Sequence, residues 1–179
     1  MKRLLFSICF LSILLAVPPL PAQEDAGAAG DVPTTAEAVG DWTLLCQEGA
    51  VLTCRLVQRL DIENEAGTGR LLQATLVRNL DGILMVLELP FGLDLRAGIV
   101  VQFDDNEEIP LPFTSCYASG CQVIALLSPE HEEQFRIGDV MRVGFRGLGQ
   151  EQTLVAEVSL NGSGRGLALL PPPPPPPEG

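Results

Sequence analysis

Apolar residues occupy every second position over much of the middle and end of the chain. Residues 52–60, 141–146 and 153–160 each place most of their apolar side chains on one parity and mostly polar or small ones on the other. A period of two predicts strands of a sheet with one buried face. Residues 83–89 are instead almost continuously apolar, which predicts a strand that is buried on both faces or that closes a barrel.

Turn residues separate these apolar runs. Asp81-Gly82, between two of them, predicts a tight hairpin. Further Gly-, Asn- and Asp-rich turns are expected at residues 65–69, 96–98, 104–106 and 147–149. About eight to ten short strands result, so the predicted fold class is all-β: an antiparallel β-sandwich or a partly closed barrel.

One segment has a helical pattern. Ser128 is a good N-cap, Pro129 suits the first helical position, and acidic residues fill the first turn, which predicts one short helix ending near Gly138. His131 lies in this segment between two glutamates and is expected to be a solvated surface residue. Residues 162–166 are interpreted as a loop, and residues 167–170 as a late final strand.

The two ends of the chain differ in composition from the middle. Residues 1–22 combine a basic start, a short apolar run and a small residue before a polar stretch, which predicts a signal peptide cleaved after Ala22. An uncleaved anchor is the alternative, although the run is short for a membrane span. Residues 23–39 are predicted to be a flexible leader, residues 40–170 the β domain, and residues 171–179 a polyproline tail. The tail is expected to be a stiff spacer or a disordered end; the alternative is that it docks on a partner.

Cysteine spacing predicts two local disulfides. One of the five cysteines, Cys9, leaves with the signal peptide, and the remaining four allow three pairings. Because they form two close pairs, we expect Cys46–Cys54 and Cys116–Cys121, each closing a short loop. A four-cysteine zinc site and a redox motif both require tighter spacings and are disfavoured.

Charge limits the possible partners. The net charge of −12 becomes −14 once the two positive charges of Lys2 and Arg3 leave with the signal peptide. Such a surface repels phosphate groups and anionic lipids, so we expect no nucleic acid and no membrane surface as partner. No stable membrane span is expected after cleavage, and the predicted location is the periplasm, the cell surface or the medium.

An ordered series of motifs resembles a known family. Trp42-x3-Cys46, Cys54, Leu89-Pro90-x-Gly92-Leu93-x-Leu95-x2-Gly98, Asp104 and Cys116-x3-Gly120-Cys121 together resemble the invasion-associated locus B family of alphaproteobacteria, over about Asp41–Leu169. The resemblance implies an exported β-rich envelope protein, named for a link to host-cell entry, with no agreed biochemical activity. Family members typically have Phe after Ser-Leu-x-Gly, whereas Ser163 follows Gly162 here.

Catalytic chemistry is poorly represented in the sequence. The single histidine has no evident nucleophile, and Ser163 lacks the motif of a nucleophile elbow. Four acidic residues between a strand and Pro110 are weak candidates for a divalent cation, namely Asp104, Asp105, Glu107 and Glu108. We expect no cofactor; a periplasmic hydrolase, a metal-binding protein or a small-ligand carrier are the alternatives.

The remaining candidates concern binding. A disulfide between Cys116 and Cys121 would hold the loop of Tyr117, Ala118, Ser119 and Gly120 rigid, which lowers the entropic cost of binding. Trp42, the single tryptophan, is expected to be a core residue packed against a disulfide. The sequence therefore predicts a non-catalytic envelope protein that contacts an unknown envelope or host protein.

Overall fold

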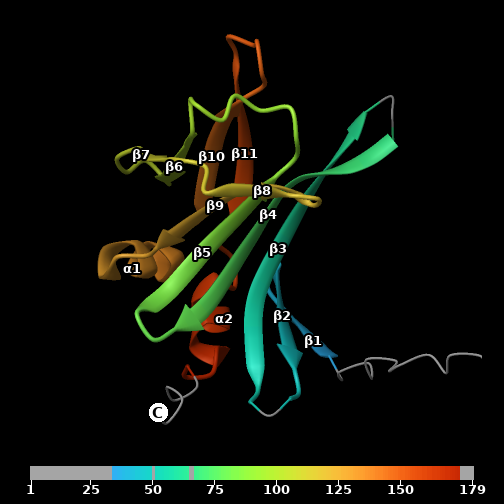
Figure 1. Ribbon diagram of the computed structural model, residues 1–179. Coiled ribbons are helices and arrows are strands. Elements are labelled where there is room, and N and C mark those ends of the chain that lie inside the picture. Colours follow the sequence, from blue (N-terminus) through green and yellow to red (C-terminus); the bar gives the residue numbers. More distant parts are fainter. Residues whose placement is uncertain (1–33, 50, 65–66, 174–179) are drawn as a thin grey trace, which may run out of the picture. The chain divides into compact units, whose positions relative to one another are not determined.

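The computed structural model describes residues 34–49, 51–64 and 67–173 (Figure 1). Contacts divide the chain into residues 1–31 and residues 32–179, and the fold lies in the second unit. The predicted signal peptide and the first part of the predicted leader lie outside the described residues.

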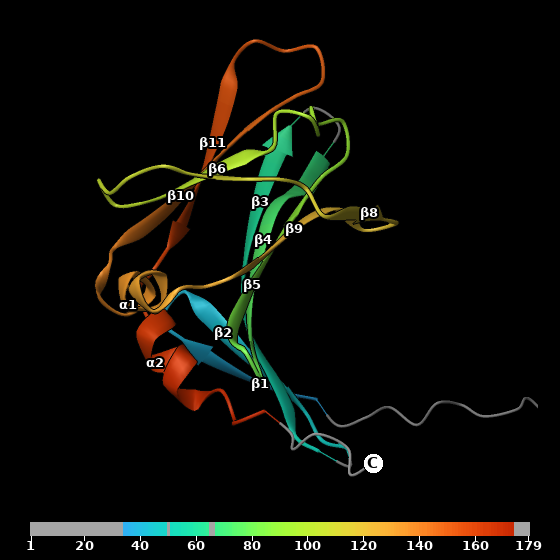
Figure 2. The same cartoon turned by 60° about the vertical axis from the view of Figure 1, so that its left-hand side comes forward.

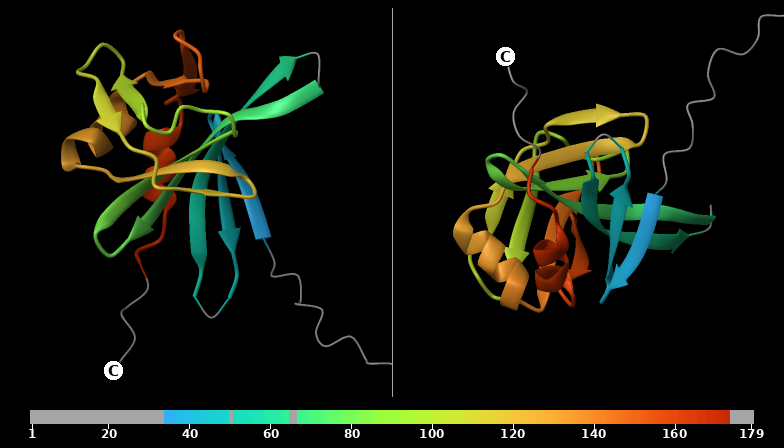
Figure 3. Two further views of the ribbon diagram at one scale, coloured as in Figure 1. Left: turned by 45° about the horizontal axis from the view of Figure 1, so that its top comes forward. Right: turned by 90° about the horizontal axis from the view of Figure 1, so that it is seen from below.

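The larger of two antiparallel sheets has seven strands in the order β1-β2-β3-β4-β5-β9-β8. β3 and β4 form a long hairpin whose far end pairs only within itself and projects beyond the neighbouring strands (Figures 1 and 3). The strands are β1 (Thr34–Val39), β2 (Trp42–Gln47), β3 (Thr53–Asn64), β4 (Gly67–Asn79), β5 (Gly82–Leu89), β8 (Ser115–Tyr117) and β9 (Gly120–Leu126).

The second sheet has four strands in the order β11-β10-β6-β7 and faces the first (Figure 2). Two helices, α1 (Pro129–Ile137) and α2 (Ser163–Leu169), contact each other, and α2 also contacts β1, β2 and β3. The strands are β6 (Ile99–Phe103), β7 (Ile109–Leu111), β10 (Val140–Arg146) and β11 (Thr153–Ser159).

The core lies between the facing sheets. Alternate residues of β4, β5 and β9 on one side, and of β6, β10 and β11 on the other, are buried. Beyond the end of the small sheet, the two helices cover the large sheet. Phe135 of α1 packs edge-on against Trp42 and Phe103, with ring centroids 6.2 and 5.1 Å apart. The predicted all-β fold with two disulfides is confirmed, and its sheets are open rather than closed into a barrel.

A buried polar bridge joins the two sheets. Gln58 of β3 donates to the carbonyls of Asp41 and Ser159, at 3.0 and 3.1 Å, and accepts from the Ser159 amide at 2.9 Å. The indole Nε1 of Trp42 also donates to the Ser159 carbonyl, at 2.8 Å. These bonds fix the end of β11 over the β1–β2 turn and the middle of β3.

Several local predictions are confirmed. The Cys46–Cys54 and Cys116–Cys121 disulfides form, and each joins directly opposite positions of two adjacent strands. The hairpin at Asp81-Gly82 joins β4 to β5, where the Asn79 side chain accepts from both of these amides. Helix α1 starts after Ser128, whose side chain accepts from the His131 amide, and ends at Gly138.

Other local predictions are wrong. Residues 34–39 of the predicted leader form strand β1, which pairs with β2 along its whole length although only Val39 is buried. Residues 83–89 alternate between buried and half-buried instead of being buried on both faces. The prediction that Trp42 belongs to the core is confirmed.

The C-terminal prediction of a loop and a final strand is also wrong, because Ser163–Leu169 is a helix. The Ser163 hydroxyl donates to the carbonyls of Phe135 and Leu160, which ties α2 to α1. Gly166 lies directly against Leu56 of β3, so its missing side chain permits the close approach of the helix. Leu170 is buried, and Pro171 follows it where the helix ends.

Candidate binding surface

The large sheet has an apolar face turned away from the small sheet. Because register places outward residues of neighbouring strands side by side, one row forms across β3, β4, β5 and β9, and a second across β4, β5 and β9 with Arg55 at its β3 end. Ile124 and Leu126 in these rows are 42% and 51% exposed, so this side is open to solvent. We call it the outer apolar face; its apolar residues are Val57, Val86 and Ile124 in one row, with the buried Thr75 between the first two, and Val77, Leu84 and Leu126 in the next.

The loop predicted from the second cysteine pair lies at the tip of the β8–β9 hairpin. Tyr117 is 60% exposed, and Ala118 and Ser119 form the turn. Gly120 has φ +136°, and a Cβ there would lie 2.2 Å from the Leu89 carbonyl oxygen. Glycine is therefore required at this position for both its conformation and its close contact with β5.

A charged network fixes this loop to the sheet. The Glu88 carboxylate accepts from Gln73 at 2.8 Å, and from Gln122 and Ser119 at 3.2 Å each. Arg70 lies 3.9 Å from the same carboxylate and donates to the Ser119 carbonyl. Since both side chains are largely buried, this pair is shielded from water more than a surface ion pair.

The network and the outer apolar face are adjacent. On β9, Gln122 precedes Ile124 by two positions, and both residues are outward; on β5, Glu88 and Val86 have the same relation. The disulfide-closed loop, the polar network and the apolar rows therefore succeed one another along one face of the sheet. No sequence pattern indicated Glu88 or Arg70, because their contacts depend on the register shift between β3 and β4 and on the position of the β8–β9 turn beside β5.

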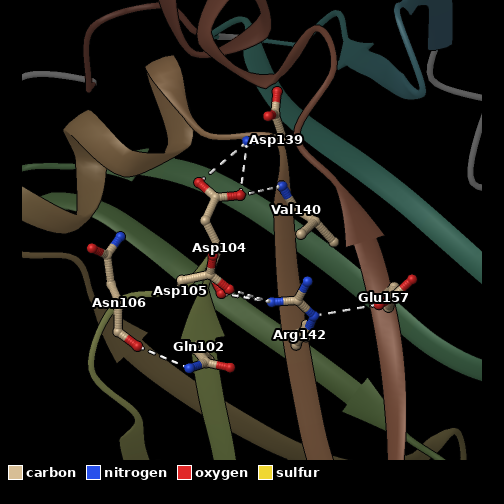
Figure 4. Close-up of polar contacts among 8 residues, drawn as sticks. All are labelled: Gln102, Asp104, Asp105, Asn106, Asp139, Val140, Arg142 and Glu157. Carbon is tan, nitrogen blue, oxygen red and sulfur yellow. Dashed lines mark hydrogen bonds and ion pairs between the residues drawn. The ribbon is translucent and has the colours of Figure 1, made fainter.

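Asp104 and Asp105 of the predicted acidic turn have different partners (Figure 4). One Asp104 carboxylate oxygen accepts from the amides of Asp139 and Val140, at 3.1 and 3.0 Å, which joins the end of β6 to the start of β10. The backbone of Asp104 has φ +47°, a conformation that aspartate tolerates better than most residues. Asp104 thus has a structural role at this position.

Arginine balances the neighbouring acids. Arg142 donates to the Asp104 carbonyl at 2.6 Å and lies 3.9 Å from Asp105 and 3.4 Å from Glu157 (Figure 4). Glu107 and Glu108 are exposed, and they line a shallow hollow between the β6–β7 turn and α1. Within the described part of the chain, no three His, Cys, Asp or Glu residues are grouped so as to hold a metal ion.

His131 is half-buried rather than fully solvated, contrary to the expectation. Its ring stacks on Phe103, with centroids 5.9 Å apart and planes 17° apart. Phe103 is a core residue, so the imidazole covers one edge of the core. No helix of the described residues is long and apolar enough to cross a membrane.

Comparison with known proteins decides the family. The profile described as "Invasion associated locus B (IalB) protein" matches residues 42–171. The chain belongs to the IalB family. This match runs from Trp42 in the core to Pro171 after α2, and so includes both helices and every described strand except β1.

Individual members agree with this assignment. Two invasion protein B homologues of Brucella abortus, from strain 2308 and from biovar 1 strain 9-941, are each 28% identical over 144 residues, which is 79% of this chain and 82% of theirs. The crystal structure of invasion associated protein B from Bartonella henselae matches with a TM-score of 0.65 at 22% identity, covering 75% of this chain and 92% of that one. This IalB-family protein therefore has the fold of the Bartonella protein.

Proposed function

We propose that this protein is a non-catalytic binding protein of the cell envelope, and that it contacts an envelope or host protein through the outer apolar face and the Tyr117–Gly120 loop. The two disulfides fit a protein that folds in an oxidising compartment, outside the cytoplasm. The names of its Brucella and Bartonella relatives refer to invasion. The proposal therefore includes contact with the host cell as a role of this chain.

The observation that carries the proposal is an exposed apolar face beside a rigid aromatic loop. Large contiguous apolar patches are rare on the surface of monomeric soluble proteins, and where they occur they mark interaction sites. Tyr117 supplies an exposed aromatic side chain, a residue type enriched in interface centres. The disulfide and the Glu88 network order the loop in advance, which lowers the entropic cost of binding.

Crosslinking in intact cells tests the surface. A photoreactive phenylalanine derivative placed at Ile124 or at Tyr117 should give the same discrete adduct with one partner protein. The matched control is Val155, which is as exposed but lies on the outward side of the small sheet, and it should give no such adduct. The proposal is wrong if neither position forms an adduct, or if Val155 forms the same one.

The loop is tested separately. Replacing Cys116 and Cys121 by serine should reduce the adduct formed at Tyr117, because the loop must then be ordered on binding. The chain-entropy estimate for so short a loop is about 2 kcal/mol, which the remaining core should tolerate. Protease treatment of intact cells then decides between an envelope partner and a host partner, since a protected protein cannot contact a host cell.

A further inference from the structure

Two apolar side chains point between the two sheets and yet are exposed. Leu154 of β11 has the same parity as the buried Ala156, but it is 50% exposed. Ile62 of β3 has the same parity as the buried Gln58, but it is 44% exposed; the register shift of this hairpin skips a residue of β4, so the alternation of β3 continues. Opposite Ile62 lies Gly69, where an added Cβ would be more than 4 Å from any described atom except those of its chain neighbours. The space between the sheets is therefore open at these residues.

These exposed side chains lie at the same end of the protein. Gln58 and Ser159 are hydrogen-bonded across the sheets. Ile62 is about 13 Å beyond Gln58 along β3, and Leu154 is about 17 Å from Ser159 along β11. Because β3 ends and β11 begins at the same end (Figures 1 and 2), Ile62 and Leu154 flank one opening between the sheets.

The edge of β11 beside this opening has no strand partner. β11 is the last strand of its sheet, and the Ser159 amide and carbonyl bond to Gln58 rather than to β10. Since backbone direction alternates along an antiparallel strand, the N–H and C=O groups of Thr153, Val155 and Glu157 also point off the sheet. Among the described residues, none pairs with this side of β11.

The other three sheet edges are less suited to pairing. β7 and β8 are three residues long, and β7 contains Pro110. β1 is longer, but its exposed residues are threonine, alanine and glutamate. β11 has seven residues without proline or a cationic side chain, and it exposes Leu154 on its inward side and Val155 on its outward side. An open edge of this kind is a template for a further strand, which natural proteins usually prevent.

We propose that an extended, basic segment of another exported protein adds to β11 as a fifth strand of the small sheet. The backbone of the segment pairs with Thr153, Val155 and Glu157, and its inward apolar side chains cover Leu154 and Ile62. Water competes for the backbone groups, so pairing sets the register and burial of the apolar side chains supplies most of the affinity. The net charge of −12 favours basic residues on the outward side of the segment.

This interaction goes beyond the proposed function, because β11 is not part of the outer apolar face. A photoreactive residue at Val155 should therefore give an adduct that differs in mass from the adduct formed at Ile124.

Hydrogen exchange in the mature full-length protein tests strand addition. The probe is a short synthetic peptide of alternating valine and lysine. At a probe concentration of about 100 times its Kd, exchange of the Val155 and Glu157 amides should slow by about a hundredfold. The Leu154 and Ala156 amides already face β10 and should change little. Protection of alternate amides distinguishes strand pairing from contact through side chains alone.

Substitutions on the edge provide a second test. Val155→Pro removes an outward N–H and leaves the bonds to β10 in place, since proline is tolerated where the N–H of an edge strand faces solvent. It should abolish protection of the Glu157 amide, whereas the matched control Val155→Thr keeps the N–H and should bind the probe as the unchanged protein does. Leu154→Ser and Ile62→Ser alter exposed side chains only, and each should weaken probe binding about fivefold.

Other results would overturn the proposal. The probe could protect neither the Val155 nor the Glu157 amide, or it could shift only the resonances of Ile124 and Leu126, which would place it on the outer apolar face. Protection without the probe that disappears on dilution would identify the occupant as a second copy of this chain. Crosslinking at Ile124 does not depend on β11, so the two proposals fail independently.

Discussion

The buried Gln58 amide should contribute measurably to stability, because it joins the two sheets. The side chain is 5% exposed and makes three hydrogen bonds, two to Ser159 of β11 and one to the Asp41 carbonyl. Gln58→Met keeps the length of the side chain and removes all three. The strand pairing of β3 and the packing of its neighbours are left in place.

The size of the stability loss depends on which hydrogen bonds each former partner of Gln58 keeps. The Ser159 carbonyl keeps the Trp42 indole as donor at 2.8 Å, and water replaces the amide at the exposed Asp41. The Ser159 amide loses its acceptor, and a buried donor left unpaired costs about 1–3 kcal/mol. Loss of the other two hydrogen bonds costs about 1 kcal/mol, and burial of the apolar thioether offsets about 1 kcal/mol. We therefore expect a net loss of stability of roughly 2 kcal/mol.

Urea unfolding of the mature, oxidised protein measures this loss. With a slope of about 2 kcal/mol per M, the midpoint should fall by about 1 M while the slope stays constant. The matched control is Gln152→Met, an exposed residue whose substitution should change stability by less than about 0.5 kcal/mol. If Gln58→Met behaves like this control, the bridge does not stabilise the fold and the reasoning is refuted.

Two further substitutions test the close contacts of the fold. Gly166→Ala would place a Cβ 2.4 Å from the buried Leu56 side chain; overpacking of about 1–3 kcal/mol should outweigh a helix-propensity gain of about 1 kcal/mol, and a higher urea midpoint would contradict this. Asp104→Ala removes the acceptor of the Asp139 and Val140 amides; these two amides should exchange hydrogen faster than in the unchanged protein, and unchanged exchange would show that Asp104 does not hold β10.

The strands were predictable where burial is one-sided and local. In β10 and the second half of β11, residues 141–146 and 156–158 alternate because one side contacts the core, whereas Leu154, on the predicted buried side, is exposed. Turn chemistry was equally local at Asp81-Gly82, and so was the cap at Ser128. Each of these features depends on residues within a few positions of one another, which is why the sequence alone suffices for them.

The two ends of the fold were not predictable in this way. Five of the six residues of β1 are exposed, so no apolar period indicates a strand, and backbone pairing with β2 holds it in place. Helix α2 contains two glycines and starts after Gly162, with no side-chain cap. Its stability comes from the contacts of Ser163 with α1 and of Gly166 with Leu56, which are tertiary.

The candidate surface was predictable only in part, for a related reason. The cysteine spacing indicated the Tyr117–Gly120 loop, but the residues that fix it come from β4 and β5 and meet only through strand register. Between Leu60 and Asp61 the register of β3 and β4 shifts, and Arg70 lies beyond this shift, so parity counted along β4 misplaces it. A sequence pattern can therefore find a loop that a disulfide closes, but not the side chains that support it.

Gln58 and Glu88 show what such polar residues contribute. Gln58 occupies an inward position between Leu56 and Leu60, where an apolar residue would satisfy the alternation equally well. Its hydrogen bonds are directional, so they select one placement of β11 over β3, which apolar contacts alone select less sharply. Glu88 does the same on the outward side for the β8–β9 turn. One side chain thus fixes how the sheets face each other, and the other fixes the loop that the proposed binding surface requires.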